Sequence, residues 1–113
     1  MTDLADAELT ALLGRGTQFE GKLCFEGRLR IDGHFKGSVK SDGILVIGDD
    51  ATIEADIDAA HVIIRGGTVE GEITASQSIE LHVPAKVTGN LQAPEIFMDK
   101  GVEFKGACKI VRE

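Results

Sequence analysis

The sequence predicts an all-β, single-domain protein folded as a parallel β-helix of about six coils, each with about 17 residues and three short strands. Three observations support this fold class: a five-residue motif recurs six times, apolar and polar residues alternate around it, and turn residues separate the segments. The 113 residues suffice for one domain and are too few for two. Hydrophobic residues at 42% and charged residues at 27% are ordinary for a globular protein and exclude a disordered tail protein.

The motif is apolar-x-Gly-x-apolar, which places two apolar side chains and a small residue on the same side of a strand. The small positions, called here the small-residue column, are Gly21, Gly37, Ala55, Gly71, Gly89 and Gly106. They are separated by 16, 18, 16, 18 and 17 residues. A meander of hairpins does not require the same residue type to recur at this spacing, whereas a solenoid stacks equivalent positions on one another. Because Ala replaces Gly once, we expect lack of space, rather than a positive φ throughout, to restrict the column and let the narrow coil close.

The segments follow one order in every coil. The motif segments are 19–23, 35–39, 53–57, 69–73, 87–91 and 104–108, and each of the first five is followed by an apolar pair: Leu29/Ile31, Leu45/Ile47, Val62/Ile64, Ile79/Leu81 and Ile96/Met98. Alternation with a period of two is typical of strands, and Val, Ile and Phe suit a pleated surface. Turn residues at 41–43, 48–50, 65–67, 83–84 and 93–94 separate the strands.

Residues 17–110 are therefore predicted to form the β-helix, with an N-terminal tail at 1–16 and a short C-terminal tail at 111–113. Ala5, Leu9, Leu12 and Leu13 fit one face of a short helix. This leaves three interpretations of the N-terminal tail: a flexible or loosely capping segment, a helix that docks to a partner, or a membrane attachment. Asp6 and Glu8 disfavour the last, because a helix that binds anionic lipid needs Lys or Arg on its polar side.

The two cysteines belong to the first and last coils. At a coil spacing of ~4.8 Å, Cys24 and Cys108 should lie roughly 20–25 Å apart, whereas a disulfide needs Cα atoms within about 7 Å. They cannot pair within one molecule, and we interpret both as buried, reduced thiols.

Several functional classes are disfavoured. The net charge of −7 argues against direct binding of nucleic acid. His34, His61 and His82 fall at different levels of a 17-residue coil, so they cannot share a metal ion, and each is interpreted as a lone surface side chain. Neither a nucleophile elbow nor a phosphate-binding loop motif is present. We predict no enzymatic activity, no metal and no cofactor. A cytoplasmic location is expected, since there is no long apolar run and no basic signal region.

The opening segment 12–23, Leu-Leu-Gly-Arg-Gly-Thr-Gln-Phe-Glu-Gly-Lys-Leu, and segment 31–39, Ile-Asp-Gly-His-Phe-Lys-Gly-Ser-Val, resemble the bactofilin family of bacterial cytoskeletal proteins. The motifs at 69–73 and 87–91 extend the resemblance over about residues 12–110. The resemblance implies a right-handed β-helix that polymerises end to end, without nucleotide, into non-polar filaments. It further implies a scaffold for cell shape or spatial organisation, with bactofilin paralogues or scaffolded cytoplasmic proteins as partners. Many members carry a membrane-targeting N-terminal segment; the N-terminal flank here is short, so membrane contact is not expected.

The ends of the coil stack are the expected working surface, because terminal strands carry unpaired backbone groups and no polar cap is recognisable in the sequence. The phenylalanines gather in the first and last coils, with none between residues 36 and 96. Their rings could plug the core of one molecule or pack against a second molecule. We favour the second interpretation, with Phe19, Leu23 and Phe25 at one junction and Phe104 and Ile110 at the other. The residues leave head-to-tail stacking open. The alternative function is a monomeric or small-oligomer β-solenoid that acts as a binding module.

Charge is segregated along the chain. Residues 17–40 carry a net charge of +2, residues 41–99 carry −9 and residues 100–113 carry +2. This pattern has two interpretations: an acidic surface that keeps the protein in solution, or staggered lateral association of basic ends with acidic middles.

Overall fold

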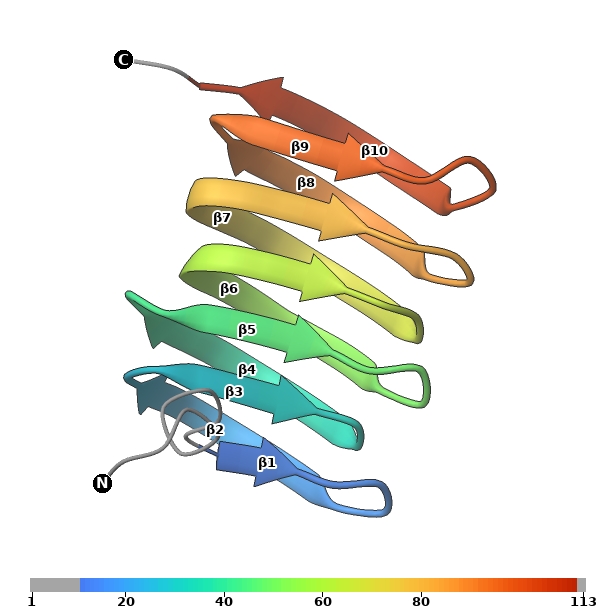
Figure 1. The fold of residues 1–113 in the computed structure, drawn as a ribbon. Coiled ribbons are helices and arrows are strands. Elements are labelled where there is room, and N and C mark those ends of the chain that lie inside the picture. The colour runs from blue at the N-terminus through green and yellow to red at the C-terminus, as the bar shows by residue number, and fades with distance from the viewer. Residues whose placement is uncertain (1–10, 112–113) are drawn as a thin grey trace, which may run out of the picture.

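The computed structural model describes residues 11–111, which form a parallel β-solenoid of about six turns (Figure 1). The short strands run from left to right at the front of the view, and the long strands return behind them while the chain climbs from the N-terminal to the C-terminal end. This path is a right-handed coil. Among the described residues, no helix is long and apolar enough to cross a membrane.

Each coil combines a short strand with a long one. The short strands are β1 (Ala11–Leu13), β3 (Arg28–Ile31), β5 (Ile44–Ile47) and β9 (Glu95–Met98). The long strands are β2 (Gln18–Phe25), β4 (His34–Ser41), β8 (Lys86–Ala93) and β10 (Glu103–Ile110), while β6 (Thr52–Ile64) and β7 (Thr68–Leu81) run through the corner and supply both parts. The three strands expected in each coil are therefore joined. Two of them form one long strand, because the chain stays extended on both sides of the small residue. In β6 and β7 the strand also continues through the corner, so all three are joined.

Equivalent motif positions lie directly on one another, as the repeat predicted. All strand pairs are parallel. Gly21 pairs with Gly37 and Gly37 with Ala55, and in the later coils Gly71 pairs with Gly89 and Gly89 with Gly106.

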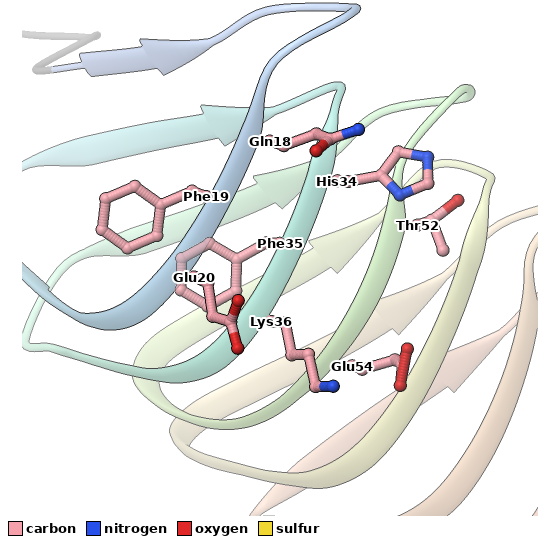
Figure 2. A pocket seen from close by; sticks show the side chains of 8 residues that line it. All are labelled: Gln18, Phe19, Glu20, His34, Phe35, Lys36, Thr52 and Glu54. Atoms are coloured by element: carbon pink, nitrogen blue, oxygen red, sulfur yellow. The ribbon is translucent and has the colours of Figure 1, made fainter.

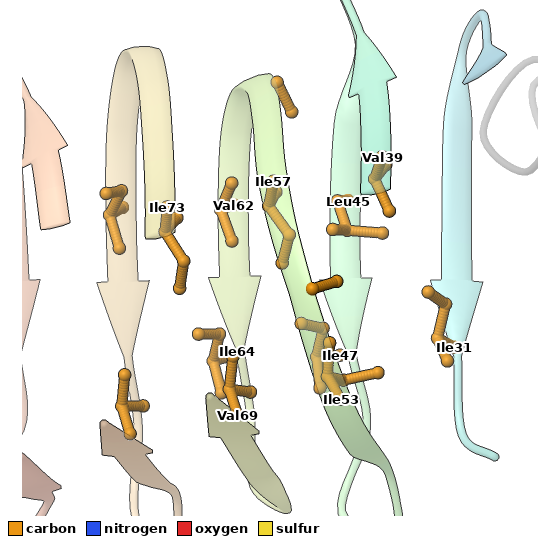
Figure 3. Close-up of a cluster of buried hydrophobic side chains, with 14 of the residues drawn as sticks. Ile31, Val39, Leu45, Ile47, Ile53, Ile57, Val62, Ile64, Val69 and Ile73 are labelled. Atoms are coloured by element: carbon orange, nitrogen blue, oxygen red, sulfur yellow. The ribbon is translucent and has the colours of Figure 1, made fainter. Parts of the chain in front are cut away.

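The alternating apolar residues fill the space inside the coils. Figure 3 shows this core, in which Leu45 of β5 lies beside Val62 in the last part of β6, and Ile57 and Ile73 lie in the first parts of β6 and β7 opposite. These four side chains are at most 2% exposed. The burial of β2, alternately exposed and half-buried, continues unbroken through Gly21. The core is a continuous column, and each coil covers the side chains of the coil before it.

The small-residue column is restricted in two ways. A Cβ atom on Gly37, Gly71, Gly89 or Gly106 would strike the carbonyl oxygen of the small residue in the preceding coil. The expected lack of space is thus present. In addition, every glycine of the column has a φ between 137° and 144°, a region that L side chains rarely adopt. Ala55 is the one member of the column without a positive φ. The column is therefore restricted in backbone conformation as well as in space, and the sequence indicated only the lack of space.

The described solenoid begins earlier than residue 17. Ala11–Leu13 form β1, which pairs with Leu29–Ile31 of β3. A helix that includes Leu12 and Leu13 is therefore wrong, because their backbone groups join the sheet and their burial follows the strand. Residues 4–10, which would form the rest of the helix suggested by the sequence, lie outside the described residues.

Candidate assembly interfaces at the two ends of the solenoid

Both ends of the described solenoid present a strand edge. β1 pairs only with β3 and β2 only with β4, while β9 pairs only with β7 and β10 only with β8, among residues 11–111. The opposite edges of these four strands carry N–H and C=O groups without a ladder partner in the described chain. Such edges are templates for pairing with another strand.

The N-terminal end face consists of the inward side chains of the first coil: Leu13, Phe19, Leu23 and Phe25. All four pack against the core but are only half-buried. Phe19 stacks on Phe35 with ring centroids 5.1 Å apart and planes 6° apart. Figure 2 shows the two rings on one side of their strands, with Gln18, His34 and Thr52 projecting from the other side around an open pocket. The sequence named three of these four residues; Leu13 was missed because its segment fits a helix pattern.

The C-terminal end face consists of the corresponding side chains of the last coil: Ile96, Met98, Val102, Phe104, Cys108 and Ile110. Phe104 is half-buried, whereas Ile110 is 49% exposed and Met98 is 40% exposed. Phe104 stacks in register on Val87, and Ile110 on Ala93. The sequence analysis named Phe104 and Ile110. Ile96 and Met98 could have been added, since they are the last members of the second apolar pair.

The interpretation of both cysteines as buried is wrong, for two different physical reasons. Cys24 lies between the inward Leu23 and Phe25, so alternation turns its side chain outward. Cys108 occupies an inward position, in register with Leu91, but no described coil covers it. Partial desolvation there raises the pKa of the Cys108 thiol. The two thiols are free and lie on strands at opposite ends of the solenoid (Figure 1).

Two of the three histidines are not lone side chains, contrary to the sequence interpretation. His61 Nδ1 lies 2.9 Å from Ser78 Oγ in the next coil. His82 Nε2 lies 3.1 Å from Glu80 Oε1, and its Nδ1 lies 2.9 Å from Asp99 Oδ2. Hydrogen bonds to Asp99 and then to Glu80 raise the pKa of His82. Neighbours 17 residues apart meet because one coil separates them, and the coil period could have indicated these contacts.

The arrangement defines a class of protein: a parallel β-solenoid whose two terminal coils offer open strand edges and apolar side chains. The family model Bactofilin, described as polymer-forming cytoskeletal, matches residues 11–109. The chain belongs to the bactofilin family.

Two curated relatives come from Myxococcus xanthus (strain DK1622). Bactofilin BacO is 33% identical over 95 residues, which cover 84% of this chain and 75% of BacO. Bactofilin BacP is 24% identical over 95 residues, again 84% of this chain but only 39% of BacP. The solid-state NMR structure of the cytoskeletal bactofilin BacA matches with a TM-score of 0.79 and 35% identity, over 90% of this chain and 98% of that chain. The β-solenoid fold and the family predicted from the sequence are confirmed.

Proposed function

We propose that this protein assembles by itself, end to end and without nucleotide, into non-polar filaments that act as a cytoplasmic scaffold for cell shape or for the spatial organisation of partner proteins. The observation that carries the proposal is the pair of end faces that no other part of residues 11–111 covers, each with an open strand edge. A structural rather than enzymatic role belongs to the proposal, because the family is described as polymer-forming and cytoskeletal.

Side chains at equivalent positions are buried in the inner coils and more exposed in the terminal coils. Phe35 is 2% exposed, while Phe19, one coil closer to the end, is half-buried. Ala93 is 1% exposed, while Ile110 above it is 49% exposed. Within residues 11–111, each end face therefore lacks the cover that one more coil would give, and the terminal coil of a second copy can supply both the strand edge and the apolar cover. Burial of apolar surface favours this contact by about 25 cal/mol per Å², and edge pairing fixes its geometry.

The family resemblance favours like-to-like junctions, in which N-terminal end faces meet each other and C-terminal end faces meet each other. Both junctions are then isologous, and a chain that alternates between them has no polarity. Head-to-tail stacking would use one junction made of both faces. The two arrangements respond differently when one face is blocked.

The test replaces one apolar side chain of each end face by a charge: Phe19→Arg and Phe104→Arg. A charge desolvated in a junction is costly, so each variant should lose filaments in electron microscopy. With like-to-like junctions, each variant keeps its other face and sediments as a dimer of about twice the 12.0 kDa chain. With head-to-tail stacking, both variants sediment as monomers, which would overturn the non-polar arrangement.

Phe97→Arg is the matched control. Phe97 also lies in the last coil and is 58% exposed, but it projects outward in register with Glu80. This variant should form filaments as the unchanged protein does. If Phe104→Arg loses its β circular dichroism, Phe104 serves the core and its assignment to the junction fails. Uniform small particles of the unchanged protein, with no nucleotide or metal added, would contradict filament formation altogether.

Co-assembly with other bactofilins is a further part of the proposal. A paralogue that presents the same open coil could take the place of a second copy at either end. Which partners the outer surface recruits depends on side chains outside the end faces.

A further inference from the structure

The outward side of the long strands carries three rows of side chains that run along the solenoid axis, the third of which is Glu20, Lys36, Glu54 and Glu70. In the first row Lys22, Ser38, Asp56 and Glu72 follow one another from β2 to β7. In the second row Lys40 of β4 is followed by Asp58 of β6. We call the surface formed by Lys22, Ser38, Lys40, Asp56, Asp58 and Glu72 the lateral face. It is basic over β2 and β4 and acidic over β6 and β7.

These charged side chains form no ion pair within the described chain. Lys22, Lys40, Asp56 and Asp58 are exposed, and none of them takes part in the ion pairs found among residues 11–111. Glu72 Oε2 accepts a hydrogen bond from Asn90 Nδ2, a neutral donor, at 2.7 Å. A shallow groove lined by Ser38, Lys40, Asp56, Asp58, Glu72 and Thr74 crosses the same surface. The lateral face thus offers separated, solvated charges of both signs on a regular sheet.

A two-fold axis parallel to the strands and midway between β4 and β6 makes the lateral face complementary to itself. This axis brings β2 of one copy over β7 of the other, and β4 over β6. Lys22 then faces Glu72, Lys40 faces Asp58 and Lys36 faces Glu54, while Glu20 faces Glu70, and symmetry produces each pair twice. Ser38, whose hydroxyl can donate, faces Asp56. Face-to-face sheets pack about 10 Å apart, a gap that lysine and carboxylate side chains can bridge.

Neighbouring registers are electrostatically unfavourable. If the axis moves half a coil, onto β6, Asp56 faces Asp56 and Asp58 faces Asp58. If it moves onto β4, Lys40 faces Lys40. An axis between β6 and β7 places Asp56 against Glu72. Like-charge pairs outnumber opposite-charge pairs in these three alternatives, whereas the reverse holds for the axis between β4 and β6, so the pattern favours that antiparallel register.

We propose that the lateral face binds the lateral face of a second copy of this chain, antiparallel, through Lys22–Glu72 and Lys40–Asp58 pairs. The contact would join neighbouring filaments side by side. It uses no residue of the end faces, so it does not depend on end-to-end stacking. Because the pairs are exposed, it should weaken as the ionic strength rises above about 0.1 M, where the screening length is about 10 Å.

The test uses charge reversal and its reciprocal. K22E/K40E makes the lateral face wholly acidic and D58K/E72K makes it mostly basic, so each variant should lose side-by-side pairing at low salt. The quadruple variant K22E/K40E/D58K/E72K has the same net charge as the unchanged protein and exchanged signs in both pairs, so it should pair again. The matched control is K86E/K100E, which changes the net charge as K22E/K40E does but at exposed positions outside the lateral face; it should pair normally.

Filament width in electron microscopy and sedimentation velocity are the readouts, at low and high salt. Paired filaments that become single in both double variants and return in the quadruple variant support the proposal. If the protein forms no filaments, the end-to-end proposal fails, and sedimentation still distinguishes lateral dimers from monomers in the same variants. Should the quadruple variant not fold, an equimolar mixture of the two double variants replaces it. Pairing that survives K22E/K40E, that is absent in the unchanged protein at low salt, or that neither the quadruple variant nor the mixture restores would overturn the proposal.

Discussion

Adding one methyl group at Gly89 should destabilise the solenoid strongly. Gly89 has a φ of 138°, and an added Cβ would lie 2.8 Å from the carbonyl carbon of Gly71 and still closer to its oxygen. Both backbones are held in the parallel ladder of β7 and β8 and cannot move apart without loss of hydrogen bonds. Forcing alanine into this region costs about 1–3 kcal/mol, and overpacking costs about another 1–3 kcal/mol. We expect Gly89→Ala to lower the free energy of unfolding by about 4 kcal/mol.

Ala55→Gly is the matched comparison, because it removes a methyl group at the same register of another coil. Ala55 is 6% exposed and has no positive φ. Greater freedom of the unfolded chain should cost about 0.5–1 kcal/mol. Urea unfolding followed by circular dichroism, at equal protein concentrations, measures both changes. At about 2 kcal/mol per molar urea, the midpoint should fall by about 2 M for Gly89→Ala. Equal midpoint shifts for the two variants would refute the steric and conformational account of the column.

Three further predictions concern single side chains. Ile73→Ala, in the middle of the core at 1% exposure, should cost about 2–5 kcal/mol in denaturant unfolding, and a negligible change would place Ile73 outside the cohesive core. At high salt, where lateral pairing is lost, Cys24 should react with maleimide equally in free and end-to-end assembled protein, whereas Cys108 should become protected on assembly; equal reactivity of Cys108 in both states would contradict a C-terminal junction. The raised pKa of His82 means that the folded state binds its proton more tightly, so its stabilising contribution is full below pH about 6.5 and is lost as the pH rises through the raised pKa. Unfolding of unchanged protein and of His82→Gln across this range should show the difference, and identical pH profiles would exclude it.

The lateral and end interfaces differ in the forces that they use. The proposed end stacking would cover apolar side chains and pair strand edges, so salt should leave it largely intact. Lateral pairing rests on exposed charges and should be salt-sensitive. A filament that keeps its length but loses its neighbours at high salt is the combined expectation.

The repeat in the amino-acid sequence was enough to predict the coil and the way its positions stack. A motif that returns every 16–18 residues places equivalent side chains in register, and the alternation around Gly21 or Gly89 identifies the inward side of every strand. The same alternation could have predicted that the side chain of Cys24 points outward. The coil period could have predicted the contact of His82 with Asp99, since 17 residues separate them.

The exposure of the end coils and the backbone angles of the small-residue column depend on how the coils pack, which no local pattern specifies. Cys108 and Leu91 occupy equivalent positions in the repeat, yet one is exposed and the other is 1% exposed, because exposure depends on whether another coil follows. Ala11–Leu13 become a strand only because β3 offers them an edge, which overrides a helical pattern of apolar residues. The positive φ of the column glycines is likewise a property of the closed coil, since a local sequence pattern specifies residue size but not the backbone angle that packing imposes.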